Sequence, residues 1–425
     1  MRNFATSIPK IAILIAFLTG VIGCNPPPPR LGKIVGSSMS PTLRGSHYSI
    51  DCPECGIQFS CDLVQANERA TVICPNCGSA ADREYWTPID ADPVSIIPES
   101  KIKRWDIIAF KRERSSGMNP EYELMTKRVV GLPGEAIQFK NGNVFANQVL
   151  ISKPLEIQKQ MRILVCDSKH QATHSRNWIL SPENPWESVN GIFQMQSPPD
   201  ENKFTWFDFH FQKNYFQTKT SPDQPACEDY YGYNQSLSRK LNRTDEVFVE
   251  LNAAIQNGSL GWRFGNQDEL YEFRINPAPS KFQIFVGKPG ETPQSILYET
   301  EILLDLKSLQ STKIEFSSFD RVLRVIVNGT ELWVYRRDSI NSPVTQTLLS
   351  FGASSDGVKF KQIRIWRDIY YFDSDAAIET PNASGDSSNT GIFVIGDNVP
   401  LSRDSRHWDS PGVAIDSIQG KVIFE

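Results

Sequence analysis

The stretch SMSPTL at residues 38–43 and the stretch KRVVGLPGE at residues 127–135 decide how this chain is interpreted. Ser38 is expected on a bend, because the ring of Pro41 restricts the backbone just after it. Lys127 begins an apolar run, so its side chain is expected to be buried. A buried lysine has a lowered pKa and, once neutral, can activate a serine hydroxyl as a nucleophile. The two stretches together therefore predict a catalytic pair of a serine and a lysine.

Two further stretches complete a series of four. They are RWDIIAFK at residues 104–111 and GDN at residues 396–398, the latter followed by Ser402, Asp404 and Arg406. In order and composition the series resembles the type I signal peptidases, the membrane-bound Ser/Lys endopeptidases that remove signal peptides from exported proteins. The resemblance covers residues 34–50, 100–150 and 390–425.

The resemblance implies a role for each residue of the site. Ser38 would be the nucleophile and Lys127 the general base, while Ser402 would hydrogen-bond to the lysine amine and orient it. The N–H of Ser38 would donate to the oxyanion of the reaction. Gly36 lies where some relatives carry a second, side-chain donor, so in this chain a second donor would be backbone or water.

Two ion pairs are also implied, Asp404 with Arg406 and Asp397 with Arg128. They would hold the last stretch against the Ser/Lys pair. One departure from the family pattern is local: many relatives carry an arginine after the GDN stretch, and this chain has Val399 there. The spacing from Asp397 to Asp404 is kept, so the expected roles are unchanged.

The implied function is a hydrolase, a serine protease that processes signal peptides in protein secretion. Catalysis would pass through an acyl-enzyme and need no cofactor. The substrates would be preproteins that carry a signal peptide. A nucleic-acid partner is not expected, because the chain has 44 basic and 49 acidic residues and a net charge of −5.

Two alternatives remain open. A Ser/His/Asp triad is the competing mechanism, with His47 or His407 as the base, although none of the five histidines lies in a motif of its own. A catalytically inactive surface protein that binds a carbohydrate or a protein through its inserted domains is the competing function. The second alternative is disfavoured, because an inactive site would be free to lose its catalytic residues and this chain keeps Ser38, Lys127 and Ser402.

The N-terminus carries a targeting signal. Arg2 and Lys10 precede an apolar run of thirteen residues, 11–23, which is short for a membrane span of about 20 residues and fits a signal h-region. The run ends in VIGC, which looks like a bacterial lipobox with Cys24 as the lipid-bearing residue of a lipoprotein. An uncleaved transmembrane anchor is the alternative. Either would hold the catalytic part on the outer side of the bacterial inner membrane.

Four cysteines form a small module between the first two catalytic stretches. CPECG and CPNCG supply Cys52, Cys55, Cys74 and Cys77, with eighteen residues between the two pairs. This spacing is typical of a zinc ribbon, in which four thiolates hold a structural zinc ion and leave no open position for catalysis. Two disulfides are the alternative, because the chain is exported.

The second insertion, residues 155–380, alternates polar and apolar residues over short runs. Such runs occur at 247–251, 271–275, 281–286, 313–316, 321–327, 331–335 and 360–366. Asn328-Gly329 separates two of them and predicts a tight hairpin. The pattern favours a jelly-roll β-sandwich, with a weaker resemblance to the concanavalin and laminin-G type, so a carbohydrate is a candidate ligand of this domain.

We therefore expect a mostly β protein. A signal-peptidase-type β-barrel core would carry a small zinc-ribbon insertion and an inserted jelly-roll β-sandwich. The expected divisions are a signal or anchor segment at 1–23, a catalytic core at 24–50, 84–154 and 381–425, a zinc-ribbon-like insertion at 51–83, and the sandwich at 155–380.

Overall fold

The structure is a computed structural model that describes residues 28–99, 101–115, 121–172, 177–180, 184–197, 203–212, 226–278, 280–302, 310–337, 343–374, 376–380 and 391–424. The predicted targeting segment 1–23 and Cys24, the residue predicted to carry a lipid, lie outside these residues. Within the described ranges, no helix is both long enough and apolar enough to cross a bilayer. The chain is mostly β, as the sequence predicted.

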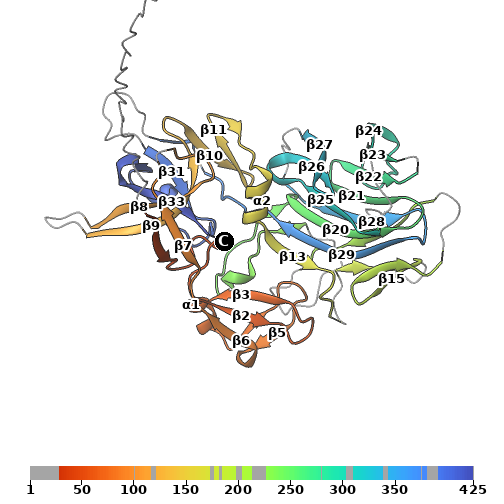
Figure 1. Ribbon diagram of the computed structural model, residues 1–425, viewed down its shortest axis with the longest axis horizontal. Helices are drawn as coiled ribbons and strands as arrows, with labels where there is room; N and C mark the ends of the chain where they lie inside the picture. The colour runs from red at the N-terminus through yellow and green to blue at the C-terminus, as the bar shows by residue number, and fades with distance from the viewer. Residues whose placement is uncertain are drawn as a thin grey trace, which may run out of the picture.

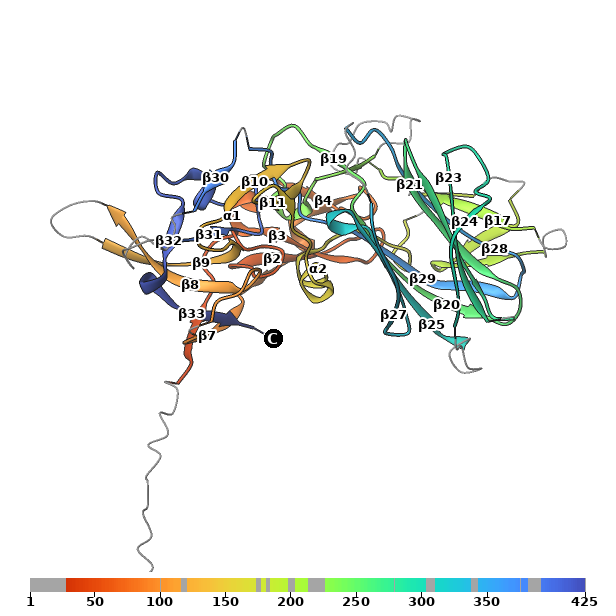
Figure 2. The ribbon, with the colours of Figure 1, turned by 90° about the horizontal axis from the view of Figure 1, so that it is seen from above.

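Three bodies make up the molecule, and Figure 1 shows all of them. The core unit lies on the left, a smaller module that contains the four cysteines lies below, and a large sandwich lies on the right. The short helix α2 (Leu155–Met161) lies between the core unit and the sandwich in Figures 1 and 2.

The core unit is built on a seven-stranded sheet whose neighbouring strands come from distant parts of the chain. In spatial order its strands are β1 (Arg30–Lys33), β7 (Pro93–Ile97), β33 (Ile418–Ile423), β8 (Ile107–Ser115), β9 (Glu121–Gly131), β31 (Gly391–Ile395) and β32 (Gly412–Ala414). β9 carries Lys127 opposite Ile108 of β8. On its other side β9 pairs with β31, where Ile395 lies opposite Arg128. The sheet therefore brings the end of the chain next to the lysine strand.

A four-stranded sheet completes the core unit. Its order is β12 (Val149–Leu150), β11 (Asn143–Ala146), β10 (Ala136–Lys140) and β30 (Ile378–Glu379). Apolar side chains of both sheets share one cluster, which includes Val130, Phe139 and Phe393. These contacts hold the two sheets together, because each sheet buries its apolar face against the other sheet.

The cysteine module contains a three-stranded sheet and a two-stranded hairpin. Its elements are β2 (His47–Asp51), β3 (Gln58–Asp62), α1 (Leu63–Asn67), β4 (Thr71–Ile73), β5 (Ala80–Asp82), the 3-10 turn η1 (Arg83–Tyr85) and β6 (Trp86–Ile89). β2 is the central strand of the three-stranded sheet. The module thus spans residues 47–89 and is wider than the predicted 51–83, because β2 and β6 begin and end outside the cysteine pairs.

Two antiparallel sheets form the sandwich. The first contains β15 (Trp186–Val189), β16 (Ile192–Met195), β29 (Val358–Arg367), β20 (Val247–Ile255), β25 (Thr312–Ser317), β26 (Val322–Val327) and β27 (Thr330–Arg336), with β13 (Ile163–Asp167) paired to β29. The second contains β14 (Trp178–Ile179), β17 (Thr205–Phe209), β28 (Thr347–Ala353), β21 (Leu260–Asn266), β22 (Leu270–Asn276), β23 (Lys281–Gly287) and β24 (Ser295–Glu301). The strands expected from alternation all lie in these two sheets.

Apolar side chains of both sheets meet in one core, which contains Leu251 of the first sheet and Trp262 and Phe351 of the second. The predicted hairpin is confirmed: Val327 pairs with Thr330 across Asn328 and Gly329, and both turn residues have a positive φ. That backbone suits a two-residue turn between twisted strands. Trp262 is fully buried, so it serves the core and is not available to stack on a sugar.

The sandwich ends earlier than the sequence indicated. β29 ends at Arg367, and Ile369 and Tyr371 already belong to the apolar cluster of the core unit. β30 then pairs with β10 of the core unit. The inserted body is therefore nearer 163–367 than 155–380, since the residues at both ends of the predicted range pack on the core unit or between the two bodies.

Candidate active site

Ser38 and Lys127 lie together although 89 residues separate them in the chain. Ser38 lies in the turn that follows β1, and Lys127 lies on β9. The Nζ atom of Lys127 donates a hydrogen bond of 2.8 Å to the Oγ atom of Ser38. A serine and a base in this contact form the arrangement that activates a hydroxyl nucleophile.

Burial sets the protonation of this lysine. Lys127 is 3% exposed, and the loss of solvent lowers the pKa of its amine below the usual value. The carboxylates of Asp404 and Asp397 act in the opposite direction, but the net shift of the pKa is downward. A lysine with a lowered pKa is neutral over more of the physiological range and can accept a proton.

Arg128 follows Lys127 in the same strand and points to the other face of β9. Its Nε and Nη2 atoms donate to the two carboxylate oxygens of Asp397 at 2.7 and 2.6 Å. Both side chains are completely buried, and Nη1 of the arginine donates to the Trp105 carbonyl at 2.8 Å. The hydroxyl of Thr42 also donates to Asp397. This ion pair ties the serine stretch, β9 and the GDN stretch to one another.

The second ion pair fixes the loop that carries Ser402. Arg406 donates from Nε and Nη2 to the two oxygens of Asp404 at 2.8 and 2.9 Å. The buried carboxylate of Asp404 also accepts the Gly396 N–H at 3.0 Å. The loop that follows β31 is therefore held against the end of that strand.

Ser402 lies near the pair but is not bonded to the lysine amine. Among the described residues its buried Oγ atom has no hydrogen-bond partner. Gly396 is what allows this approach, because a Cβ at that position would overlap with Ser402 Oγ and with the carbonyl oxygen of Ser38. The bond from Ser402 to Lys127 that the resemblance implied is thus absent from this arrangement, although the hydroxyl lies beside the serine stretch.

Gly36 has a positive φ of 76°, and a Cβ at this position would meet open space. Its carbonyl accepts the N–H of Gly45 at 3.0 Å, which closes the loop that bears the serine. An L-residue would be strained with this φ, so the backbone itself favours glycine here.

Four contributing residues were missed by the sequence analysis. Asn398 donates from its N–H to the Ser38 carbonyl and from Nδ2 to the Ser37 carbonyl, both at 3.0 Å. Its amide also pairs with Asn234, and Tyr231 bonds to Ser40; Thr42 is the fourth. Asn398 belongs to the quoted GDN stretch, but no local pattern identified Asn234 or Tyr231.

The histidines take other roles. His47 is buried and its Nδ1 atom bonds to the Gly45 carbonyl at 2.8 Å. His407 is half exposed and lies 3.6 Å from Asp404. Among the described residues, the side-chain partner of the Ser38 hydroxyl is Lys127, so the triad alternative has no geometric basis in this structure.

The four predicted cysteines converge at one point of the cysteine module. Their Sγ atoms all lie within 4.8 Å of one another, with 3.6 Å between Cys52 and Cys77 and 3.8 Å between Cys55 and Cys74. Zinc bound to thiolates at about 2.3 Å in a tetrahedron separates the sulfur atoms by about 3.8 Å. All four are free thiols in this structure, and the donor set fits that ion.

A family model described as signal peptidase, peptidase S26, matches residues 8–184, a range that includes Ser38 and Lys127. Signal peptidase I V of Bacillus subtilis (strain 168) is 36% identical over 53 residues, 12% of this chain and 27% of that protein. The chain thus spans about a quarter of the length of this curated relative. The family match supports a relationship to the signal peptidases for residues 8–184, and the curated relative belongs to the same family by its name.

Three solved structures illustrate a distant similarity. The carbohydrate recognition domain of Emp47p has a TM-score of 0.31 and 9% identity, and the match covers 48% of this chain and 94% of that one. The carbohydrate-binding module CBM66 from Bacillus subtilis has a TM-score of 0.27 and 10% identity over 45% and 92%. Galectin LEC-6 from Caenorhabditis elegans has a TM-score of 0.23 and 13% identity over 29% and 83%. Because all three TM-scores are below 0.5, they decide nothing about this chain.

Proposed function

We propose that this chain is a Ser/Lys endopeptidase that removes signal peptides from exported preproteins. The observation that carries the proposal is the hydrogen bond of 2.8 Å between the buried amine of Lys127 and Ser38 Oγ. A structural lysine of this kind would be expected to pair with a carboxylate, since an unpaired buried charge is costly. Lys127 instead contacts a hydroxyl and has a lowered pKa, as a general base requires.

The reaction would follow from these two side chains. Neutral Lys127 takes the proton of Ser38 as Oγ bonds to the scissile carbonyl carbon, and the Ser38 N–H donates to the developing oxyanion. The protonated amine then gives its proton to the leaving nitrogen as the C–N bond breaks. Water, deprotonated by the same amine, attacks the acyl carbonyl carbon, and the amine returns the proton to Ser38 Oγ as the acyl C–O bond breaks. The substrate would reach the serine as an extended segment paired with a strand of the core unit, with small side chains in shallow apolar pockets.

The substrates and the location belong to the same proposal. Signal-peptide-bearing preproteins emerge at the outer face of the bacterial inner membrane, so the catalytic unit would lie on that side. Cys24, if diacylated, would anchor the chain through two acyl chains, which gives stable attachment. An uncleaved transmembrane segment over residues 11–23 is the alternative anchor.

The first test is cleavage of a purified preprotein by the wild-type chain and by Ser38→Ala and Lys127→Ala, with the new N-terminus identified by mass spectrometry. The wild type should cut after a small residue, and each variant should lose activity by about 1,000-fold or more, because neither half of the pair works alone. Ser295→Ala, a change at an exposed serine on the edge strand β24 of the sandwich, should leave the rate unchanged. Full activity of Lys127→Ala would exclude the lysine as the base.

The pH dependence of kcat/KM should report the lysine. Burial lowers its pKa, and the neutral amine is the active form, so activity should fall as the pH decreases through that lowered value. The measurement is kcat/KM between pH 5 and 10, with circular dichroism to show that the chain stays folded. A flat profile from about pH 5 to 9 would be incompatible with this base.

We also propose that the four cysteines hold a structural zinc ion. Their sulfur–sulfur distances fit a tetrahedral ion, and the module is too small to be stabilised by its own core. Asn76 lies within the second cysteine pair and donates to Cys55 Sγ at 3.7 Å, a contact that suits a bound thiolate. The ion would support the fold and take no part in the reaction, because four thiolates fill its coordination sphere.

Native mass spectrometry of the full chain tests the metal. One zinc ion is expected in the wild type and in Cys61→Ser, and none in Cys74→Ser. Cys61 is a suitable control because it is buried in the same module but lies outside the four-cysteine cluster. A wild-type mass lower by four protons and without zinc would instead establish two disulfides.

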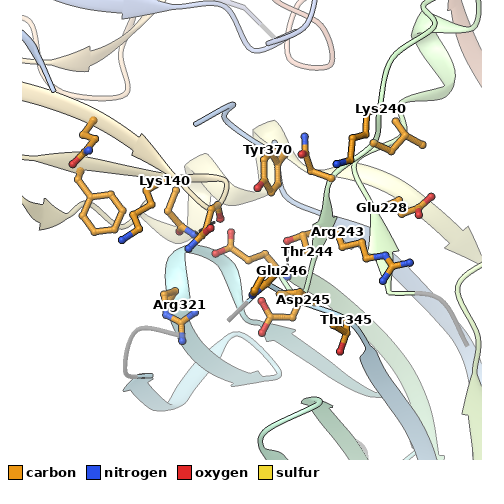
Figure 3. Close-up of a pocket in the computed structure, with 18 of the residues that line it drawn as sticks. Lys140, Glu228, Lys240, Arg243, Thr244, Asp245, Glu246, Arg321, Thr345 and Tyr370 are labelled. Carbon is orange, nitrogen blue, oxygen red and sulfur yellow. Dashed lines mark hydrogen bonds between the residues drawn. The ribbon is translucent and has the colours of Figure 1, made fainter. Parts of the chain in front are cut away.

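A second candidate function, ligand binding, rests on a cavity of about 770 Å³ between the core unit and the sandwich. Figure 3 shows Lys140 of β10 on one side and Arg243, Thr244 and Asp245 of the sandwich on the other, with Glu246 between them. Carboxamide side chains are frequent in its lining, which includes Gln138, Asn141, Asn143, Gln148 and Asn242. The volume is typical of small-molecule sites, which often lie between domains.

Two buried acceptors of the cavity lining lack partners among the described residues, Asn143 Oδ1 and Glu246 Oε1. Burial raises the pKa of Glu246 well above its usual value, which favours the protonated carboxyl, a group that can both donate to and accept from hydroxyl groups. Tyr370 adds an aromatic side chain to the lining. These features suit a hydroxyl-rich ligand, and we propose a short saccharide.

The full chain should bind to an array of immobilised glucose, mannose and N-acetylglucosamine oligosaccharides. Asn143→Leu should lower retention about 10-fold, because the apolar side chain of similar size no longer accepts a hydrogen bond. Asn276→Leu on β22, away from the cavity, is the matched control. Absence of retention, or equal retention by both variants, would rule out this site.

A further inference from the structure

Residues 229–235 of the inserted sequence leave the sandwich and enter the candidate active site; we call this segment the clasp. It contains the 3-10 turn η2 (Gly232–Asn234). Arg367, at the end of β29, fixes its start by donating from Nη2 to the carbonyls of Asp229 and Tyr230 at 2.9 and 2.6 Å. The clasp is therefore anchored on the sandwich before it reaches the core unit.

The far end of the clasp meets the GDN stretch. Nδ2 of Asn234 donates to Oδ1 of Asn398 at 2.6 Å, and Nδ2 of Asn398 donates to Oδ1 of Asn234 at 3.0 Å. Asn234 is 5% exposed and Asn398 is 1% exposed. A reciprocal amide pair in a buried place fixes the orientation of both side chains, because turning either one would oppose two donors and two acceptors.

Asn398 in turn holds the backbone of the nucleophile. Its N–H donates to the carbonyl of Ser38, and its Nδ2 also donates to the carbonyl of Ser37, both at 3.0 Å. The side-chain amide of Asn398 thus divides its hydrogen bonds between the serine stretch and Asn234. With Asn234 in place, the amide is fixed in the orientation that serves Ser37.

Tyr231 makes a second contact between the clasp and the serine stretch. Its hydroxyl lies 2.6 Å from Oγ of Ser40, a fully buried side chain two residues after the nucleophile. Burial raises the pKa of Tyr231, so the phenol remains neutral and able to donate. The clasp therefore acts on both sides of Ser38, directly at Ser40 and through Asn398 at Ser37.

The cysteine module supports the opposite side of the clasp. Gln235 donates to the Ile73 carbonyl at 2.7 Å and accepts the Ile73 N–H at 2.9 Å. A Cβ on Gly232 would lie 3.2 Å from the ring of Pro75, which belongs to the second cysteine pair. The clasp is thus packed between the sandwich, the cysteine module and the serine stretch, and has little freedom to move.

We propose that Asn234 is a positioning residue for the nucleophile, so that the inserted sequence completes the peptidase site. This inference rests on the proposed peptidase activity. Loss of the Asn234 side chain leaves the buried Asn398 amide with an unsatisfied donor and acceptor, and the amide is then free to turn away from Ser37. A shift of about 1 Å in a reacting group can reduce a rate by about 100-fold.

The test compares kcat and KM of the full-length wild type, Asn234→Ala, Asn234→Asp and Asn266→Ala on one preprotein. Asn266 is the matched control: it is a fully buried asparagine whose amide bonds to Asp245, remote from the serine stretch. Asn234→Ala should lower kcat by about 10- to 100-fold with KM changed less than about 2-fold, because the clasp holds the nucleophile and not the substrate. Asn234→Asp keeps the acceptor and loses the donor, so its kcat should be intermediate.

The outcomes separate the two proposals. An inert wild type would overturn the peptidase itself. An active wild type with undiminished kcat in Asn234→Ala would overturn only the role of the clasp. Equal losses of kcat in Asn234→Ala and Asn266→Ala, in step with lower melting temperatures, would show that Asn234 supports the fold in general and does not position the serine.

Discussion

The buried ion pair of Arg128 and Asp397 is the constraint on which the site depends, because it joins residues 269 positions apart with no access to water. Two desolvated charges are stable only when the geometry is close and their remaining hydrogen bonds are made. Both conditions hold here: the contact is bidentate, the Trp105 carbonyl accepts from the arginine, and the Thr42 hydroxyl donates to the carboxylate. The serine stretch, the lysine strand and the last stretch are therefore fixed as one unit.

Two adjacent buried residues differ in charge behaviour because their partners differ: the Asp397 carboxylate outweighs the effect of burial on the pKa of Arg128, and no such ion pair offsets it at Lys127. Arg128 keeps its charge in a protein interior, and its guanidinium is matched by a carboxylate. The Lys127 amine contacts a hydroxyl instead, so burial lowers its pKa. Alternation along β9 places the two side chains on opposite faces, which separates the structural charge from the proposed base. A single strand thus supplies both the support of the candidate site and its proposed base.

The insertions contribute to the site as well as separating its parts. The cysteine module begins within a few residues of the serine stretch, and the sandwich returns the clasp to it through Tyr231 and Asn234. Gln235 links that clasp to the cysteine module. The motifs alone do not describe this site, because part of the support of Ser38 comes from residues outside them.

The sequence by itself determined the features that depend on local pattern: the strands of the sandwich through alternation, the turn at Asn328-Gly329 through backbone preference, and the convergence expected of Ser38 with Lys127 through motif order. It did not determine the contact of Asn234 with Asn398, the separation of Ser402 from the lysine amine, or the cavity between the two large bodies. Each of these depends on how surfaces formed by distant segments pack, and a contact across 164 residues leaves no periodicity in the chain. Only the tertiary structure decided them, because packing and burial act on neighbours in space.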